Sequence, residues 1–82
     1  MILLYKNEAL KQLKRIGTAD LLKVKRKIQF IKDNPLLGKR LQGKHSGQLC
    51  VRAWPLRIIY TFDPPSQTVE IITVDYRGQV YK

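Results

Sequence analysis

Hydrophobic positions in the first part of the chain predict a short strand followed by a helix. Residues 2–5 form an apolar run of strand length. Apolar side chains then recur at the spacing of one helix face over residues 8–16, which predicts the first helix. Asn7 is suited to cap its start, because its side-chain oxygen can accept a hydrogen bond from a free backbone N–H, and Gly17 is suited to end it.

A second apolar stripe predicts a longer helix that ends before Pro35, since the residue preceding a proline disfavours helical angles. Thr18 is suited to cap the start of this helix. Phe30 lies off the stripe, roughly 130° from its centre, so it either packs on the first helix or docks a partner. The residues of the stripe are Leu21, Val24, Ile28 and Ile31.

Beyond a loop, the hydrophobic period changes to two. Residues 34–47, with three glycines and four basic residues, predict the loop. Three β-rich segments joined by short turns then predict an antiparallel meander. The segments are residues 48–53, 56–62 and 68–74. The pattern predicts one α+β domain over residues 1–82, with a short N-terminal strand and a two-helix hairpin packed on one face of an antiparallel β-sheet.

The charge of the chain indicates a polyanionic partner. Sixteen Lys and Arg residues stand against 6 Asp and Glu, which gives 82 residues a net charge of +10. The resulting potential attracts nucleic acid, anionic membranes or acidic proteins, and nucleic acid is favoured. No apolar run approaches the roughly 18 residues needed to span a membrane, and the N-terminal run is too short for a signal peptide. We therefore expect a cytoplasmic protein with no membrane partner.

Conventional catalytic constellations are not apparent in the sequence. With one histidine and one cysteine, we expect neither a metal cluster nor a cofactor. His45 is interpreted as a solvated loop residue, and Cys50 as a small strand residue that forms no intrachain disulfide.

Two arginines on the predicted meander are the main chemical candidates. Arg52 and Arg57 flank the turn at Trp54-Pro55, so antiparallel pairing brings them together if they share a face. Guanidinium groups so placed repel each other unless an anion lies between them, and phosphate matches their donors. Trp54 has two interpretations, a stacking surface for a nucleobase or a cover for the edge of the core.

The last segment adds two tyrosines to this set. Tyr76 and Tyr81 each offer a face on which a base can stack and a phenol that can move a proton. Arg77 lies between them and supplies a further positive charge.

Short motifs follow one another in a characteristic order along the chain. They are Ala9 and Leu13, Asn34-Pro35, Gly38-Lys39, Leu41, Gly43, Gly47, Arg52, Leu56-Arg57-Ile58-Ile59-Tyr60 and Tyr76-Arg77-Gly78-Gln79-Val80-Tyr81. In this order the chain resembles the RelE/ParE superfamily of bacterial and archaeal toxins, the toxic halves of type II toxin–antitoxin pairs. The resemblance implies a microbial RNase-like fold of RelE type. It also implies one of two activities, because the RelE-like branch cuts messenger RNA in the ribosomal A site and the ParE-like branch poisons DNA gyrase.

The resemblance to the RelE-like branch implies roles for individual residues. Arg52 and Arg57 match basic residues of the sheet, the second of them the phosphate-binding arginine. Tyr81 matches the catalytic tyrosine and would be the general base, with Tyr76 as the alternative, while Arg77 matches the basic residue that precedes it. The residues expected to bind RNA beside them are Lys39, Lys44, His45, Trp54 and Tyr76.

The leading hypothesis is a toxin that cleaves mRNA in the ribosomal A site, without metal, by attack of the 2′-hydroxyl on the adjacent phosphate. The alternatives are a ParE-like inhibitor of gyrase and a basic RNA-binding domain without activity. The expected partners are the ribosome with its mRNA and a cognate antitoxin, an acidic protein that folds on binding and forms a hetero-oligomer with the toxin.

Overall fold

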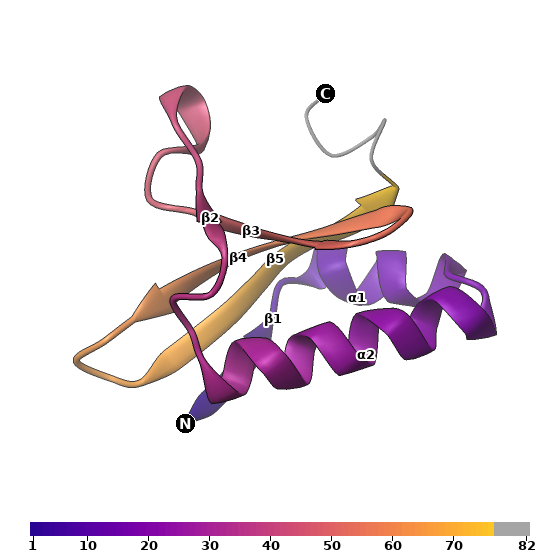
Figure 1. The fold of residues 1–82 in the computed structure, drawn as a ribbon, viewed down its shortest axis with the longest axis horizontal. Coiled ribbons are helices and arrows are strands. Elements are labelled where there is room, and N and C mark those ends of the chain that lie inside the picture. The colour runs from indigo at the N-terminus through magenta and orange to yellow at the C-terminus, as the bar shows by residue number, and fades with distance from the viewer. Residues whose placement is uncertain (77–82) are drawn as a thin grey trace.

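A five-stranded sheet with two helices on one face makes up residues 1–76, the part of the chain that the computed structural model describes. The strand order in the sheet is β1-β5-β4-β3-β2. Figure 1 shows both helices on one side of the sheet and the segment with the short helix η1 on the other. In chain order the elements are β1 (Ile2–Tyr5), α1 (Asn7–Arg15), α2 (Thr18–Asp33), β2 (Lys39–Arg40), η1 (Gly43–His45), β3 (Leu49–Ala53), β4 (Leu56–Asp63) and β5 (Thr68–Tyr76).

The predicted α+β class is confirmed, with one correction to the sheet. Strands β3, β4 and β5 form the antiparallel meander expected from the sequence. Strand β1 instead runs parallel to β5, with Ile2 opposite Thr68 and Tyr5 opposite Ile71, so the sheet is mixed. No hairpin joins β1 to β5, so turn chemistry leaves their relative direction open. Between β1 and β5 the chain passes through both helices and through strands β2, β3 and β4, which leaves room for the return that parallel pairing needs.

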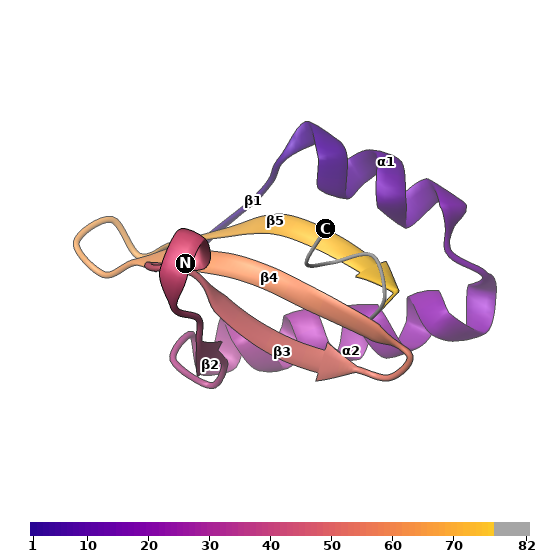
Figure 2. The same ribbon diagram turned by 90° about the horizontal axis from the view of Figure 1, so that it is seen from above.

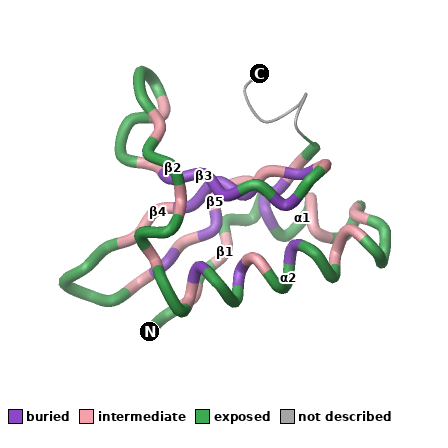
Figure 3. The backbone as a smooth tube through the Cα atoms, viewed as in Figure 1, coloured by how far each residue is buried: buried purple, intermediate pink, exposed green. Residues whose placement is uncertain are grey.

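The apolar stripe of α2 packs on the sheet as predicted. Helix α1 packs there through Leu13 and Ile16, as its apolar spacing predicts, but Leu10 is exposed. Ala9 of α1 and Val24, Ile28 and Ile31 of α2 are buried against alternate residues of the strands (Figure 3). Phe30 lies outside this core with 56% of its surface exposed, so the interpretation that it packs on the first helix is wrong. The strand residues of the core are Leu49, Val51, Ala53, Leu56, Ile58, Tyr60, Val69, Ile71 and Val74.

The helix starts differ from the predicted caps by one residue. Lys6 and Gly17 occupy the N-cap positions, and neither helix start has a side-chain capping bond. Asn7 and Thr18 are the first residues of their helices, so their predicted capping roles are wrong. The second helix ends at Asp33, directly before Asn34-Pro35, as the proline predicts.

Tyr60 anchors the segment between α2 and β3 to the sheet. Its ring is fully buried, its hydroxyl donates to the Pro35 carbonyl at 2.8 Å, and it accepts from the Gly38 N–H at 2.9 Å. A Cβ atom at Gly38 would lie 2.8 Å from this hydroxyl and 3.0 Å from Cβ of Leu49, so only glycine fits. Burial raises the pKa of the Tyr60 hydroxyl above its ordinary value, and the hydrogen bond from Gly38 opposes the rise.

Helix α1 covers the part of the β5 edge that β1 leaves open. Figure 2 shows α1 beyond β5, while α2 runs beneath β3 and β4. The side-chain oxygen of Gln12 accepts from the Val74 N–H at 2.8 Å, which satisfies a donor on this edge. None of the helices among residues 1–76 is long and apolar enough to cross a membrane.

Candidate functional site

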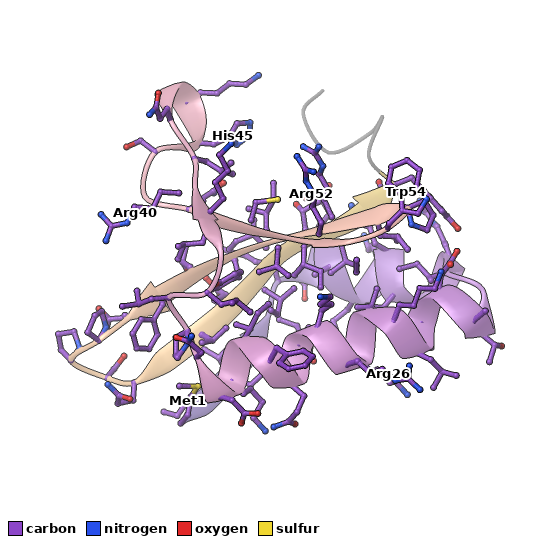
Figure 4. The ribbon with its side chains drawn as sticks, viewed as in Figure 1. Met1, Arg26, Arg40, His45, Arg52 and Trp54 are labelled. Atoms are coloured by element: carbon purple, nitrogen blue, oxygen red, sulfur yellow. The ribbon has the colours of Figure 1, made fainter. Side chains whose placement is uncertain are left out.

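Arg52 and Arg57 lie directly opposite each other on β3 and β4. Their neighbours Val51 and Ile58 are buried in the core, so the alternation of a strand directs both arginines to the sheet face away from the helices. Figure 4 shows Arg52 projecting from that face. The prediction that the two arginines are cross-strand neighbours is confirmed, and the condition that they share a face is met. Side chains in this position are close enough for their charges to interact.

The acidic residue Asp75 flanks this pair on the side of β5. Asp75 of β5 lies opposite Arg57, and its carboxylate accepts from the backbone N–H of Tyr76 at 2.8 Å and from the Gln12 amide at 3.4 Å. On the other side Arg57 faces Arg52, which is exposed. The like charges therefore meet at the surface, where an anion could bind between them.

A groove of about 430 Å³ extends from the two arginines across β3 towards α2. Among the lining residues within 1–76, four are cationic and none is acidic. A second groove, of about 360 Å³, has only Arg40 as a charged lining residue, so the first is the better anion site. The residues that line the first groove are Lys27, Leu37, Lys39, Leu41, Cys50, Val51, Arg52 and Arg57.

The groove contains one predicted RNA-binding residue and one that sequence reasoning missed. Lys39 of β2 lies opposite Cys50 and shares the groove with the arginines. Lys27 comes from α2, where the hydrophobic period identified it only as a position outside the apolar stripe. No local signal separates Lys27 from the other lysines of this helix, because its place depends on how α2 packs against β3.

Trp54 lies beside the arginines at the turn between β3 and β4. Its side chain is 67% exposed, so of its two interpretations the cover for the core edge is wrong. Together with Leu56 and the two arginines it lines a small hollow of about 60 Å³. Figure 4 shows Trp54 on the same side of the sheet as Arg52, where its indole offers a stacking face.

Tyr76 lies on the opposite side of the sheet from the arginines, which corrects its expected place beside them. It pairs with the buried Leu56, and its hydroxyl donates to Asp20 of α2 at 3.4 Å. The alternation of β5 explains the difference, because Asp75 takes the position across from Arg57 and the next residue must face the helices.

Lys44 and His45 lie in η1, on the segment that projects from the sheet on the side away from the helices. Lys44 is exposed, whereas His45 is half-buried, with Nδ1 3.4 Å from the side-chain oxygen of Gln48. His45 is therefore more enclosed than a solvated loop residue.

Arg77 and Tyr81, the remaining catalytic candidates, lie outside the described residues. Their roles, and the RNA contacts of the other candidates, stay predictions. Within residues 1–76 no three His, Cys, Asp or Glu side chains come together as a metal site.

Comparison with known protein families identifies a match for nearly the whole chain. A family model described as the ParE toxin of the type II toxin–antitoxin system, parDE, matches residues 3–81. None of the curated proteins matches the sequence.

Solved structures share the fold over nearly the whole chain. A chain of the toxin–antitoxin complex RelBE2 from Mycobacterium tuberculosis has 26% sequence identity and a TM-score of 0.84, over 93% of this chain and 96% of that one. The YoeB/ParE toxin from Agrobacterium tumefaciens has 20% identity and a TM-score of 0.83, over 94% and 99% of the two chains. The isolated RelE toxin of E. coli has 21% identity and a TM-score of 0.80, over 98% and 89%.

Proposed function

The chain belongs to the ParE toxin family of type II toxin–antitoxin systems, within the RelE/ParE superfamily, and from this premise we propose that it is an endoribonuclease that cleaves mRNA in the ribosomal A site. The observation that carries the proposal is the pair formed by Arg52 and Arg57 at the end of a cationic groove. A phosphodiester between two guanidinium groups would have its negative charge neutralised where charge builds up during cleavage.

The proposed reaction needs no group beyond the chain, its substrate and water. The 2′-hydroxyl attacks the adjacent phosphorus and loses its proton to a general base, while the bond to the 5′-oxygen breaks and that oxygen takes up a proton from water. The products are a 2′,3′-cyclic phosphate and a 5′-hydroxyl. Arg52 and Arg57 stabilise the charge on the phosphate, Tyr81 is the proposed base, and Arg77 assists the leaving group.

The need for a 2′-hydroxyl makes RNA, and not DNA, the substrate. A protein of 82 residues can enclose little of a flexible strand, so the ribosome is proposed to hold the mRNA in a reactive geometry.

Toeprinting on translating ribosomes tests the residue assignment. Wild type should cleave, and Arg57→Ala and Tyr81→Phe should each lose most of the activity, since a single group of this kind is worth roughly 10²–10³-fold in rate. Lys25→Ala, which removes an exposed charge from α2 outside the groove, is the matched control and should cleave as wild type does. Equal cleavage by all four proteins would refute the assignment.

Inhibition of DNA gyrase is the second candidate, and the match to the ParE toxin model favours it. A supercoiling assay separates the two functions, because an inhibitor would block gyrase at concentrations that leave mRNA intact on ribosomes. If expression in growing cells caused neither growth arrest nor a change in translation, a non-catalytic RNA-binding domain would be the better description.

We further propose that the partner is a short acidic antitoxin that folds on this chain and forms a hetero-oligomer with it. RelBE2, a structural relative, is itself a toxin–antitoxin complex. The net charge of +10 provides the complementary surface for an acidic segment. Copurification of an acidic protein from the neighbouring reading frame, and loss of toxicity when it is coexpressed, would support the proposal. Persistent toxicity in the presence of that protein would contradict it.

A further inference from the structure

Lys27 is a cation that the proposed reaction does not use, yet the fold brings it to the arginine groove. It belongs to α2, which packs on the other face of the sheet, but its side chain lines the same groove as Arg52 and Arg57. The side chain is half-buried, and its Nζ lies 5.6 Å from the centroid of the Phe30 ring. A cation at this distance is attracted by the negative face of an aromatic ring. The contact with Phe30, which does not itself line the groove, thus limits the positions that the Lys27 ammonium group takes.

Lys39 reaches the groove from β2 and stands at a fixed offset from the arginines. It lies opposite Cys50, two residues before Arg52 on β3, so Lys39 and Arg52 are diagonal neighbours about 7–8 Å apart along the sheet. Arg57 lies directly across from Arg52. The backbone of Lys39 is therefore offset from the arginine pair within the groove that all three residues line.

The shape and charge of the groove favour a polyanion over a single anion. The lysines and arginines share one groove with apolar walls from Leu37, Leu41 and Val51, and the described part of the chain adds no acidic residue to its lining. One phosphate between the arginines would leave the lysine charge uncompensated. A strand of RNA carries its phosphates at regular intervals and would neutralise both positions.

We infer that Lys27 and Lys39 form a second phosphate subsite, which holds the phosphodiester next to the one bound by Arg52 and Arg57. The inference rests on the proposed function, because it takes a single strand of RNA as the occupant of the arginine site. Lys27 and Lys39 are then substrate-positioning residues, since phosphate contacts set the register of a strand and do not read its bases. Phe30 acts through Lys27.

Two short ligands that differ by one phosphate test the inference on the free protein. A dinucleotide has one phosphodiester and a trinucleotide has two, and 2′-O-methyl groups on both prevent cleavage. Affinities measured by NMR titration should show that wild type binds the trinucleotide several-fold more tightly than the dinucleotide. Lys27→Gln and Lys39→Gln should lose most of this gain while binding the dinucleotide within about twofold of wild type.

Matched variants separate a subsite from a general effect of charge. Lys25→Gln removes an exposed charge from the same helix outside the groove and should keep the gain. Phe30→Leu should lose part of the gain in affinity for the trinucleotide. The substitution removes the aromatic ring that attracts the Lys27 ammonium group and keeps the side chain apolar. With a longer single strand, Lys27→Gln should lower the slope of log K against log salt by about 0.7, the value for one phosphate contact.

The inference would be overturned if wild type bound both ligands equally or bound neither. It would also be overturned if Lys27→Gln behaved like Lys25→Gln, or weakened both ligands by the same factor. These results do not depend on ribosomal cleavage. If Lys27→Gln loses the tighter binding of the trinucleotide and the wild-type protein cuts no mRNA, the subsite is supported and the nuclease proposal is refuted. If wild type cleaves mRNA but binds the trinucleotide no more tightly than the dinucleotide, the subsite alone is refuted.

Discussion

The hydroxyl group of Tyr60 should hold the segment that carries Lys39 against the sheet, and Tyr60→Phe removes only that group. The substitution keeps the ring in the core and deletes the hydrogen bonds to Pro35 at 2.8 Å and from Gly38 at 2.9 Å. Each such bond contributes a net 0.5–1.5 kcal/mol, so the two together stabilise the fold by about 2 kcal/mol. For a domain of this size that corresponds to a fall in Tm of about 8–16 °C.

The pKa of Tyr60 adds a pH dependence with a definite sign. Burial raises it above the ordinary value of 10.0, so the unfolded chain loses this proton at a lower pH than the folded protein does. The contribution of the Tyr60 hydroxyl to the free energy of unfolding is complete below the pKa of the unfolded chain. It is lost as pH rises through the pKa of the folded protein, by up to about 1.4 kcal/mol per pH unit. The difference in stability between wild type and Tyr60→Phe should therefore narrow at alkaline pH.

Urea unfolding followed by circular dichroism, at neutral pH and above the pKa of tyrosine, measures both effects. Tyr5→Phe is the matched control: burial raises the pKa of Tyr5 as well, but no hydrogen bond of its hydroxyl is found within residues 1–76. Tyr60→Phe should also weaken binding of a single strand of RNA, because Lys39 would be less well positioned. A variant within about 0.5 kcal/mol of wild type at neutral pH would refute the reasoning, since each lost bond should cost at least that much.

Three further substitutions test the packing and the charge of the fold. Gly38→Ala places Cβ 2.8 Å from the Tyr60 hydroxyl and should cost about 1–3 kcal/mol in urea unfolding; a double-mutant cycle with Tyr60→Phe should recover part of that loss, and strict additivity would contradict the proposed contact. Arg52→Gln removes one of two opposed like charges, so it should abolish cleavage while leaving Tm unchanged or raising it, most clearly at low salt; a fall in Tm of more than about 5 °C would indicate a structural role instead. Gln12→Leu removes the acceptor of the Val74 N–H and should cost about 1 kcal/mol, with faster hydrogen exchange of that amide; unchanged exchange would show that the edge is protected in another way.

Most elements of the fold could be predicted because burial follows the periods of helix and strand. The stripe that ends with Ile28 and Ile31 and the alternation through Val51 and Ala53 identify which faces meet in the core. The two-residue strand Lys39–Arg40 inside the predicted loop could not be found this way, since both residues are exposed and their pairing with β3 depends on the anchor at Tyr60. The direction of β1 was equally open, because its partner is more than sixty residues away in the chain.

By itself the sequence determined the pairing of Arg52 with Arg57, because residues on either side of a short turn meet through local geometry alone. Tertiary structure decided the rest of the site. The register of β5 places Tyr76 with the helices, and the packing of α2 brings Lys27 to a groove on the other side of β3. The physical reason is that hydrophobic periodicity separates buried from exposed positions, whereas the meeting of two exposed side chains depends on how distant elements dock.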